Sequence, residues 1–367
     1  MVARETPRIV VSGATGVVGS ALLNKIIADN GTDYELFAIV KNQGRFEDLA
    51  GLLGERVGMV KPIIADLRAP ADLEREALRI GKCRQAVIVH CAADVSWGKT
   101  AEQLRPINVE GTMAVAQFAK VIGEKSTLIY VSSAYTRDKN WEYRNGYEET
   151  KAEAHRSLKR QCELPTSVFS CSLVVGDRTS GTISAFHGIY PLLKLASGSP
   201  PFVVGNPDCL VDIIPVDWTV SELWEMIKRS LEGETDSEVV AAAGDKRITL
   251  SDMFAIFNQR INLRRADMGL PEFSETVFVN NRRWEFLKRS MEAWKPEGLS
   301  VRDFKHFEML LSIYRPYTTS DAVRPPCGLV EEAPGVSSYL HNSVDFWLAE
   351  NATKLESQWL REARRQG

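Results

Sequence analysis

The stretch IVVSGATGVVGSALLNKII, from Ile9 to Ile27, combines a β-branched apolar run, a turn with three glycines, and the apolar spacing of an amphipathic helix. Its glycines follow the pattern GxxGxxG. Glycines in a strand-to-helix turn let the backbone approach a pyrophosphate, and the helix N-terminus favours its negative charge. We therefore predict a dinucleotide site here, although a glycine-rich turn without a ligand would show the same pattern. The predicted contacts are Gly13, Thr15, Gly16, Val17, Val18 and Gly19.

The composition bounds the class of protein. The chain has 367 residues, 44% of them hydrophobic and 25% charged, with a net charge of −3. This length accommodates one large α/β unit with a substrate lobe, or two modest domains. The charge balance gives no reason to expect a nucleic acid or an anionic membrane as partner. No run approaches the roughly 18 apolar residues that a membrane span needs.

The cysteines and the N-terminal segment indicate a cytoplasmic protein. The segment MVARETPRIVV is too short before the first predicted strand to be a secretory signal. The six cysteines are scattered and include no CxxC pair, which predicts reduced thiols, no disulfide framework and no metal site.

The end of the second predicted strand, Glu35 to Val40, bears on the choice of dinucleotide. An acidic residue at this place bonds the ribose 2′-hydroxyl of NAD, whereas a cation accommodates the 2′-phosphate of NADP. The sequence has Lys41 and Arg45 here and no acid at the strand end. We expect NADPH as cofactor; solvated surface cations are the alternative.

Further strands alternate with helical patterns. Val60 to Ala65 is a predicted third strand, and Ala86 to Cys91 is a continuous apolar run, which is typical of a parallel strand buried on both faces. His90 lies inside this run and is interpreted as a core histidine. Asn108 to Thr112 then opens a predicted helix. The alternation predicts a doubly wound, Rossmann-type parallel sheet.

The candidate catalytic residues follow a predicted strand, Ser126 to Val131, that leads into Ser132-Ser133. Tyr147 follows Ser133 by fourteen residues, and Lys151 comes four residues later. Residues at i and i+4 share one face of a helix. A nearby ammonium stabilises a phenolate, so we expect Lys151 to lower the pKa of Tyr147. Tyr147 would then give a proton to a carbonyl oxygen, Ser133 would bond the same oxygen, and Lys151 would also hold the nicotinamide ribose.

Several segments carry a family resemblance. They are YVSSAY (Tyr130–Tyr135), YRNGYEETKAEA (Tyr143–Ala154), LVVGDRTSGTISAFHGIYPLL (Leu173–Leu193) and VDIIPVDW (Val211–Trp218). Together with the glycines, they make the chain similar to the extended short-chain dehydrogenase/reductases. It most resembles their thioester-reductase and fatty-acyl-reductase branch, with male-sterility-type NAD-binding domains. The resemblance covers about residues 8 to 225.

The resemblance implies a function and further site residues. It implies NADPH-dependent reduction of an acyl thioester, on coenzyme A or a carrier protein, to an aldehyde, and a second round could yield the alcohol. Ser133, Tyr147 and Lys151 match the catalytic set of the branch. The further residues expected at the cofactor are Asp66, Leu67, Ala92, Ala93, Asn108 and Lys151.

Two departures from the branch concern the substrate side. Fourteen positions separate Ser133 from Tyr147, whereas the branch usually carries a longer acidic insertion. The arginine that usually precedes the VVGD segment is replaced by the stretch Ser170-Cys171-Ser172. The sequence thus leaves open the carrier, the acyl chain length and what replaces the arginine.

The predicted organisation is an NADP-binding domain over residues 1–175, with strands at about 205–245 returning to it. Residues 176–367 would form an interleaved, mostly helical substrate lobe. Ser237 to Ala243 could return to the sheet, and Thr249 to Asn262 has helical spacing with Thr249 or Ser251 as N-cap. The aromatic residues of 282–314 predict core packing; an apolar channel for a long acyl chain is the alternative.

Other functions share the same residues. The runner-up is an oxidoreductase of a free ketone or secondary alcohol, which the short spacing before Tyr147 fits slightly better. A nucleotide-sugar epimerase or dehydratase uses the same constellation, but Lys41 and Arg45 argue against its usual NAD. A catalytically silent NADPH-binding sensor is a further alternative. The sequence does not indicate the oligomeric state.

Overall fold

The chain forms two compact units. The computed structural model describes residues 6–30, 33–136, 143–198, 202–235, 238–294, 301–319 and 323–366. Unit 1 comprises Met1–Val174, Val216–Ala242 and Val323–Ala333. Unit 2 comprises Val175–Pro215, Ala243–Ala322 and Pro334–Gly367. The chain therefore leaves unit 1 after its first 174 residues and returns to it twice.

Unit 1 is built on a seven-stranded sheet in the order β11-β6-β5-β4-β1-β2-β3. Every pairing between neighbouring strands is parallel. The strand order reverses between β1 and β4, which makes their carboxyl ends the expected ligand-binding edge of a doubly wound sheet. The predicted Rossmann-type fold is confirmed. The strands are β1 (Arg8–Ser12), β2 (Glu35–Val40), β3 (Val60–Ile64), β4 (Cys83–His90), β5 (Gly123–Ser133), β6 (Thr166–Cys171) and β11 (Glu238–Ala241).

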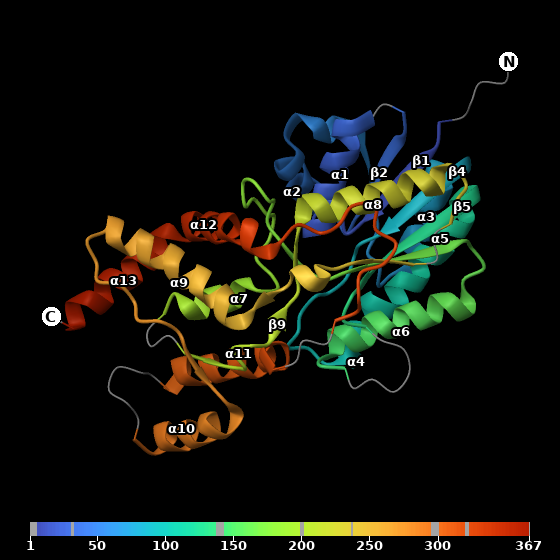
Figure 1. Cartoon of the computed structure of the whole chain (residues 1–367). Helices are drawn as coiled ribbons and strands as arrows, with labels where there is room; N and C mark the ends of the chain where they lie inside the picture. Colours follow the sequence, from blue (N-terminus) through green and yellow to red (C-terminus); the bar gives the residue numbers. More distant parts are fainter. Residues whose placement is uncertain are drawn as a thin grey trace. The chain divides into compact units, whose positions relative to one another are not determined.

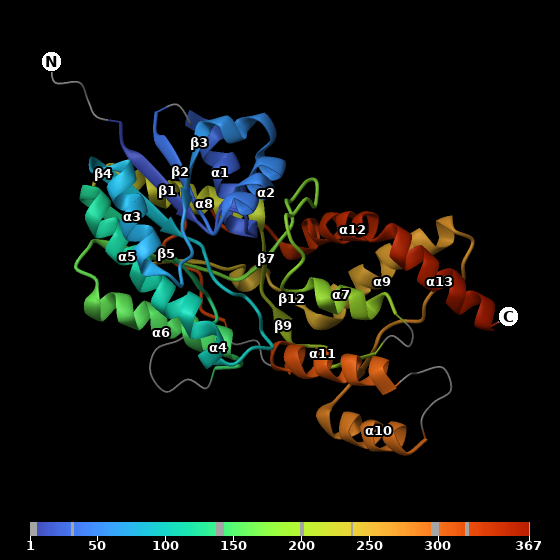
Figure 2. The same cartoon turned by 180° about the vertical axis from the view of Figure 1, so that it is seen from behind.

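Helices cover both faces of this sheet. Figure 1 shows α1 and α8 on one face, and Figure 2 shows α3 and α5 on the other. On the first face, the rings of Tyr34 and Trp224 meet edge to face with centroids 5.8 Å apart. The helices of unit 1 are α1 (Val17–Asn30), α2 (Gln43–Leu53), α3 (Pro70–Ile80), α4 (Ala101–Arg105), α5 (Gly111–Ile122), α6 (Gly146–Gln161) and α8 (Val216–Leu231).

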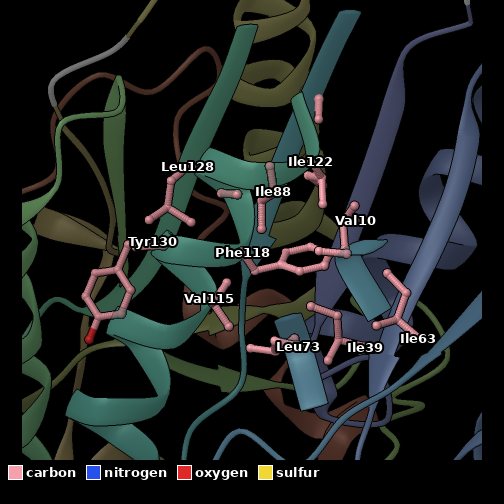
Figure 3. Packing of buried hydrophobic residues seen from close by; sticks show 14 of the residues in the cluster. Val10, Ile39, Ile63, Leu73, Ile88, Val115, Phe118, Ile122, Leu128 and Tyr130 are labelled. Carbon is pink, nitrogen blue, oxygen red and sulfur yellow. The ribbon is translucent and has the colours of Figure 1, made fainter. Parts of the chain in front are cut away.

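The core of unit 1 lies between the sheet and helices α3 and α5. In Figure 3, Phe118 of α5 and Leu73 of α3 point toward strand residues such as Ile39 and Ile88. Phe118 is 3% exposed, and burying such a side chain stabilises the fold by about 2 kcal/mol. This packing fixes the positions of the strand ends at which the candidate site lies.

The sequence predicted most of these strands closely. Glu35–Val40 has the predicted bounds, β3 ends one residue early at Ile64, and β4 ends at His90, so Cys91 lies just beyond it. Of the region 205–245 expected to return to the sheet, β11 does so. The short strands of residues 202–215 lie in unit 2.

Unit 2 is mostly helical. It contains two short strand pairs, antiparallel β12–β9 and parallel β13–β8. The predicted helix after Thr249 is present, and Thr249 caps it by accepting the Asp252 N–H. The elements are α7 (Tyr190–Ala196), β8 (Phe202–Val204), β9 (Leu210–Val211), β10 (Ile213–Pro215), β12 (Ile248–Thr249), α9 (Leu250–Asp267), β13 (Val277–Val279), α10 (Asn281–Trp294), α11 (Val301–Thr319), α12 (Leu340–Glu350) and α13 (Ala352–Gln366); β7 (Leu173–Val175) spans the boundary.

The aromatic residues of 282–314 divide between core and surface. Trp284 and Tyr314 are buried, but Phe286 is 70% exposed and Met309 is 48% exposed. Of these four described side chains, Trp284 and Tyr314 therefore have the predicted core packing. The side chains of Met291, Trp294, Phe304 and Phe307 lie outside the described residues. Among the helices that are described, none is long and apolar enough to cross a membrane.

Two glycines in helices give a matched test of the packing at the turn. A Cβ on Gly19 of α1 would lie 2.3 Å from the Gly13 carbonyl oxygen, whereas a Cβ on Gly51 of α2 meets nothing within 4 Å. Gly19→Ala should lower the free energy of unfolding by about 2 kcal/mol, because the turn has to move. Gly51→Ala should raise it by about 0.5–1 kcal/mol. Urea unfolding of both variants measures this, and equal effects would contradict the expected clash at the turn.

Candidate active site

The glycine turn connects β1 to α1 at the carboxyl edge of the sheet. Gly13 has φ 69°, and a Cβ at this position would lie 2.6 Å from the backbone nitrogen of Ala92. Gly19 packs equally closely against the Gly13 carbonyl. Gly16 is exposed at the turn, and its N–H bonds the Gly13 oxygen at 2.9 Å. The turn is thus bare backbone at a helix N-terminus, which fits a dinucleotide pyrophosphate.

The cationic side chains that follow β2 are paired with carboxylates. Lys41 Nζ lies 3.8 Å from Asp66 Oδ2, at the end of the neighbouring strand β3. Arg68, which was not among the predicted site residues, bonds the same carboxylate through Nε at 3.0 Å and a terminal nitrogen at 2.6 Å. These bonds, chiefly those of Arg68, lower the pKa of Asp66 to about 2. Arg45 instead pairs with Asp48 on the exposed surface of α2.

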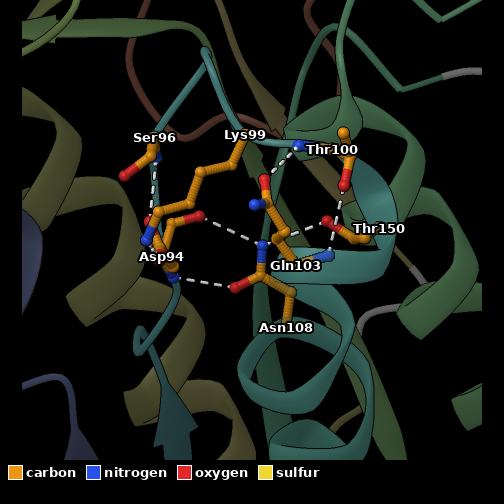
Figure 4. Close-up of polar contacts among 7 residues, drawn as sticks. All are labelled: Asp94, Ser96, Lys99, Thr100, Gln103, Asn108 and Thr150. Carbon is orange, nitrogen blue, oxygen red and sulfur yellow. Dashed lines mark hydrogen bonds and ion pairs between the residues drawn. The ribbon is translucent and has the colours of Figure 1, made fainter.

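Asn108 lies in a π-helical turn, Pro106–Glu110, that precedes α5. It is 1% exposed. Its side-chain oxygen accepts the Asp94 N–H at 2.7 Å, and its side-chain nitrogen donates to Asp94 O and Thr150 Oγ1 (Figure 4). This side chain connects the loop after β4 to α6. Its predicted contact with the cofactor stays a prediction.

Ser133 ends β5, and Lys151 bonds α6, the helix of Tyr147, to that strand. Ser133 is the last residue of that strand, and α6 carries Tyr147 and Lys151 one turn apart. Lys151 Nζ donates to the Val131 carbonyl at 2.6 Å and lies 4.1 Å from the centroid of the Tyr130 ring. The ammonium thus joins α6 to β5, the strand that ends at Ser133. Residues 137–142, in the short segment before Tyr147, lie outside the described residues.

Burial controls the acidity of this group. Burial raises the pKa of the Tyr147 phenol, with further contributions from Cys171 and Glu148. It lowers the pKa of the Lys151 ammonium to about 8. The expected lowering of the Tyr147 pKa by Lys151 is not seen, because burial of the phenol dominates. The Lys151 ammonium bonds the Val131 carbonyl. Tyr147 is accordingly a protonated acid at neutral pH, the form that a proton donor requires.

Two cysteines lie beside these residues but are not activated. Cys171 is paired with Ser133 in the sheet, and Cys91 follows β4 directly. Burial raises the pKa of Cys171 to about 11 and that of Cys91 to about 12. Because the thiolate is the nucleophile, neither thiol is suited to covalent catalysis.

An ion pair with little exposure to solvent lies at the start of α6. Glu148, 0% exposed, bonds a terminal nitrogen of Arg144 at 2.6 Å. The Arg144 guanidinium lies 4.3 Å from the centroid of the Tyr135 ring, in the segment that follows Ser133. Asn145 caps the helix by accepting the Glu148 N–H at 2.9 Å. The residues on both sides of Tyr147 are therefore held against the end of β5.

An arginine from a distant part of the chain lies near the stretch that lacks the family's arginine. Ser170 Oγ bonds Glu238 of β11 at 3.4 Å, and Glu238 is bonded by both terminal nitrogens of Arg324. The backbone N–H of Arg324 also donates to the carbonyl of Ala134 at 2.9 Å, one residue after Ser133. No local pattern in the sequence indicates this contact, because 86 positions separate Glu238 from Arg324.

The sequence matches the male sterility protein family, an NAD-binding family, over residues 11–142 and 136–223. Together these segments span more than half of the chain. The chain belongs to this family. The resemblance carried by the VSSAY and YxxxK segments is confirmed.

Segments of large synthetases are similar to this male sterility family member in sequence. A polyketide synthase-nonribosomal peptide synthetase, ffsA of Aspergillus flavipes, is 24% identical over 293 residues, which are 73% of this chain and 7% of that protein. A nonribosomal peptide synthetase, malG of Malbranchea aurantiaca, is 22% identical over 264 residues, 63% of this chain and 11% of that protein. The chain spans only a small fraction of the length of these curated relatives.

Solved structures share the fold. The terminal R domain from the myxalamid PKS-NRPS biosynthetic pathway has a TM-score of 0.68 and 16% identity, and the match covers 96% of this chain and 92% of that one. A UDP-N-acetylglucosamine 4-epimerase from Methanobrevibacter ruminantium M1 has a TM-score of 0.60 and 17% identity, covering 94% and 99%. This male sterility family member therefore has the fold of the extended short-chain dehydrogenase/reductases.

The buried ion pair offers a stability test. Glu148→Ala removes a wholly buried carboxylate that bonds Arg144, so we expect the free energy of unfolding to fall by about 3 kcal/mol or more. Glu163→Ala removes the acid of an exposed pair with Lys120 and should leave the stability almost unchanged. Thermal unfolding of both variants measures the difference, and similar melting temperatures would rule out this role for Glu148.

Proposed function

We propose that this chain is an NADPH-dependent reductase that converts an acyl thioester, on a carrier protein or coenzyme A, to the aldehyde. The observation that carries the proposal is that Lys151, on the helix of Tyr147, bonds the strand that ends at Ser133, in a member of this family. The assignment of a carrier-bound thioester is supported by the kinds of synthetase in which the relatives occur.

The roles of the residues follow from their positions and protonation. The nicotinamide cofactor, when bound, supplies a hydride to the thioester carbonyl carbon. Tyr147 donates its phenolic proton to the carbonyl oxygen, which Ser133 holds by a hydrogen bond. The resulting hemithioacetal loses the thiol and gives the aldehyde, and a second hydride and proton would give the alcohol.

Lys151 would hold the cofactor ribose in this reaction as an ammonium. With a pKa of about 8, the group is mostly charged at neutral pH. For this predicted role, Lys151 Nζ has to bond the ribose either in place of the Val131 carbonyl or in addition to it. Glu148 and Arg144 would keep Tyr147 in place during this change.

A free ketone or secondary alcohol is the alternative substrate. Ser133, Tyr147 and Lys151 would serve the reduction of a ketone, or the oxidation of an alcohol, in the same way. The fourteen-residue spacing before Tyr147 favours this alternative slightly. The two functions differ in one product, because only a thioester releases a thiol.

The deciding experiment measures NADPH loss over a panel of acyl thioesters and ketones, with thiol and trapped aldehyde assayed in the same samples. We expect thiol and aldehyde to appear in step with NADPH loss, and Tyr147→Phe to lower kcat at least about 100-fold. Tyr143→Phe, a change in a tyrosine that bonds Arg156, is the matched control. Turnover with ketones alone would favour the alternative, and near-normal turnover of Tyr147→Phe would refute the catalytic assignment.

The choice of NADPH is tested by binding to the cofactor-free protein. We propose that Lys41, Arg45 and Arg68 together receive the 2′-phosphate, because all three cations follow β2 or β3. Lys41→Ala and Arg68→Ala should each raise the Kd of NADPH about tenfold and leave that of NADH nearly unchanged. Tryptophan fluorescence titration measures both constants.

Lys25→Ala, which removes an exposed cation of α1 paired with Asp29, controls for net charge. Equal affinity of the unaltered protein for NADH and NADPH would overturn the cofactor proposal. A reversal of Lys41 and Arg45 to acids that leaves the preference unchanged would do so as well.

A further inference from the structure

A series of buried hydrogen bonds runs through the side chain of His90. The side chains of Ser12, His90 and Thr112 are each 0% exposed. Ser12 Oγ and His90 Nδ1 are 2.6 Å apart, and His90 Nε2 and Thr112 Oγ1 are 2.9 Å apart. Neither contact is explained by the proposed chemistry, because both ring nitrogens of His90 are bonded to buried hydroxyls, Ser12 of β1 and Thr112 of α5.

The other hydrogen bonds of Thr112 and Ser12 fix the direction of each bond to His90. Thr112 Oγ1 donates its hydrogen to the Asn108 carbonyl at 2.7 Å. It therefore accepts from His90, so Nε2 carries the imidazole hydrogen. His90 Nδ1 is then the acceptor for the Ser12 hydroxyl, and Ser12 Oγ in turn accepts the Ala92 N–H at 3.4 Å. Only one tautomer satisfies all of these groups.

The two ends of this series of hydrogen bonds reach the two halves of the candidate site. Ser12 directly precedes Gly13 of the glycine turn. At the other end, Asn108 donates to Thr150 Oγ1 at 3.0 Å. Thr150 donates to the carbonyls of Gly146 at 2.8 Å and Tyr147 at 3.1 Å. The bonded residues thus lead from the cofactor turn to the helix of Tyr147 (Figure 4 shows the last part).

We propose that His90 is a positioning residue that is held as the neutral Nε2–H tautomer. Through Ser12 and Thr112 it fixes α6, the helix of Tyr147, relative to the glycine turn. The proposal rests on the function proposed above for what these two elements do. Its geometric part, the tautomer and the bonded path, is independent of that function.

The surroundings keep the ring neutral. Burial, and then the charge of Lys151, lower the pKa of His90 to about 3. The ring of Tyr130 stacks on the imidazole with centroids 6.0 Å apart. A charged imidazole would have a hydrogen on Nδ1 and could no longer accept the Ser12 hydrogen bond.

The first test is nitrogen NMR of the cofactor-free protein with labelled histidine. His90 is one of five histidines, and its signals are those lost in His90→Gln. We expect a protonated Nε2 and an unprotonated Nδ1, both unchanged from about pH 5.5 to 8.5. The opposite tautomer, or titration in this range, would overturn the proposal whether or not the protein reduces thioesters.

The second test separates positioning from stability. Thr112→Val removes the hydroxyl and keeps the shape, Thr112→Ser keeps the hydroxyl, and Thr219→Val changes another wholly buried threonine, in α8. We expect Thr112→Val to speed amide exchange over residues 146–151 about tenfold and to lower kcat about tenfold, with an NADPH Kd within about twofold. Thr112→Ser should restore both, and Thr219→Val should alter neither.

Unchanged exchange over residues 146–151 in Thr112→Val would contradict the proposal, and so would a kcat within about twofold of the unaltered protein. If the unaltered protein reduces no thioester, the function proposed above fails instead. The tautomer and the exchange rates then still decide the role of His90.

Discussion

The close approach of Gly13 to the backbone of Ala92 is the constraint on which the site depends. Only a residue without a side chain fits there, since a Cβ would lie 2.6 Å from a backbone nitrogen. The contact holds the end of β1 against the end of β4, where the strand order of the sheet reverses. This point is the carboxyl edge at which a doubly wound sheet is expected to bind its ligand. The glycine turn, the loop after β4 and the end of β5 all lie at this edge.

Burial of Lys151 has an energetic cost at this edge. The fall of its pKa from 10.5 to about 8 corresponds to about 3 kcal/mol against the charged form. The Val131 carbonyl and the Tyr130 ring offset part of this cost. Such an ammonium has a strong preference for a further polar partner, which suits a group proposed to bind a ribose.

Local patterns predicted what depends on neighbours in the chain. Glycine spacing, apolar runs and the i, i+4 pair of Tyr147 and Lys151 led to the sheet and to the helix on which the pair lies. The acidity of Tyr147 could not be predicted, because burial outweighs the effect of a lysine directed to another acceptor.

Contacts between distant segments were also beyond the sequence. The pairing of Arg324 with Glu238, next to Ser170, requires the chain to return to unit 1 after residue 322. Arg68, which we propose as a phosphate ligand, could not be linked to Lys41 from the sequence, since the two side chains share the Asp66 carboxylate only once β2 and β3 are paired. His90, in contrast, was visible as a polar residue in an apolar run and Asn108 through the family resemblance, and their bonded partners could be identified only from the fold.

The central claim is that hydride and proton reach a thioester carbonyl at the end of β5. The most direct measurement follows NADPH that carries deuterium at its transferable position, reacted with an acyl thioester, by mass spectrometry of the trapped aldehyde. We predict one deuterium on the aldehyde carbon for each thiol released. Thiol release with an unlabelled acid as product, or label found only in alcohols formed from ketones, would contradict the claim.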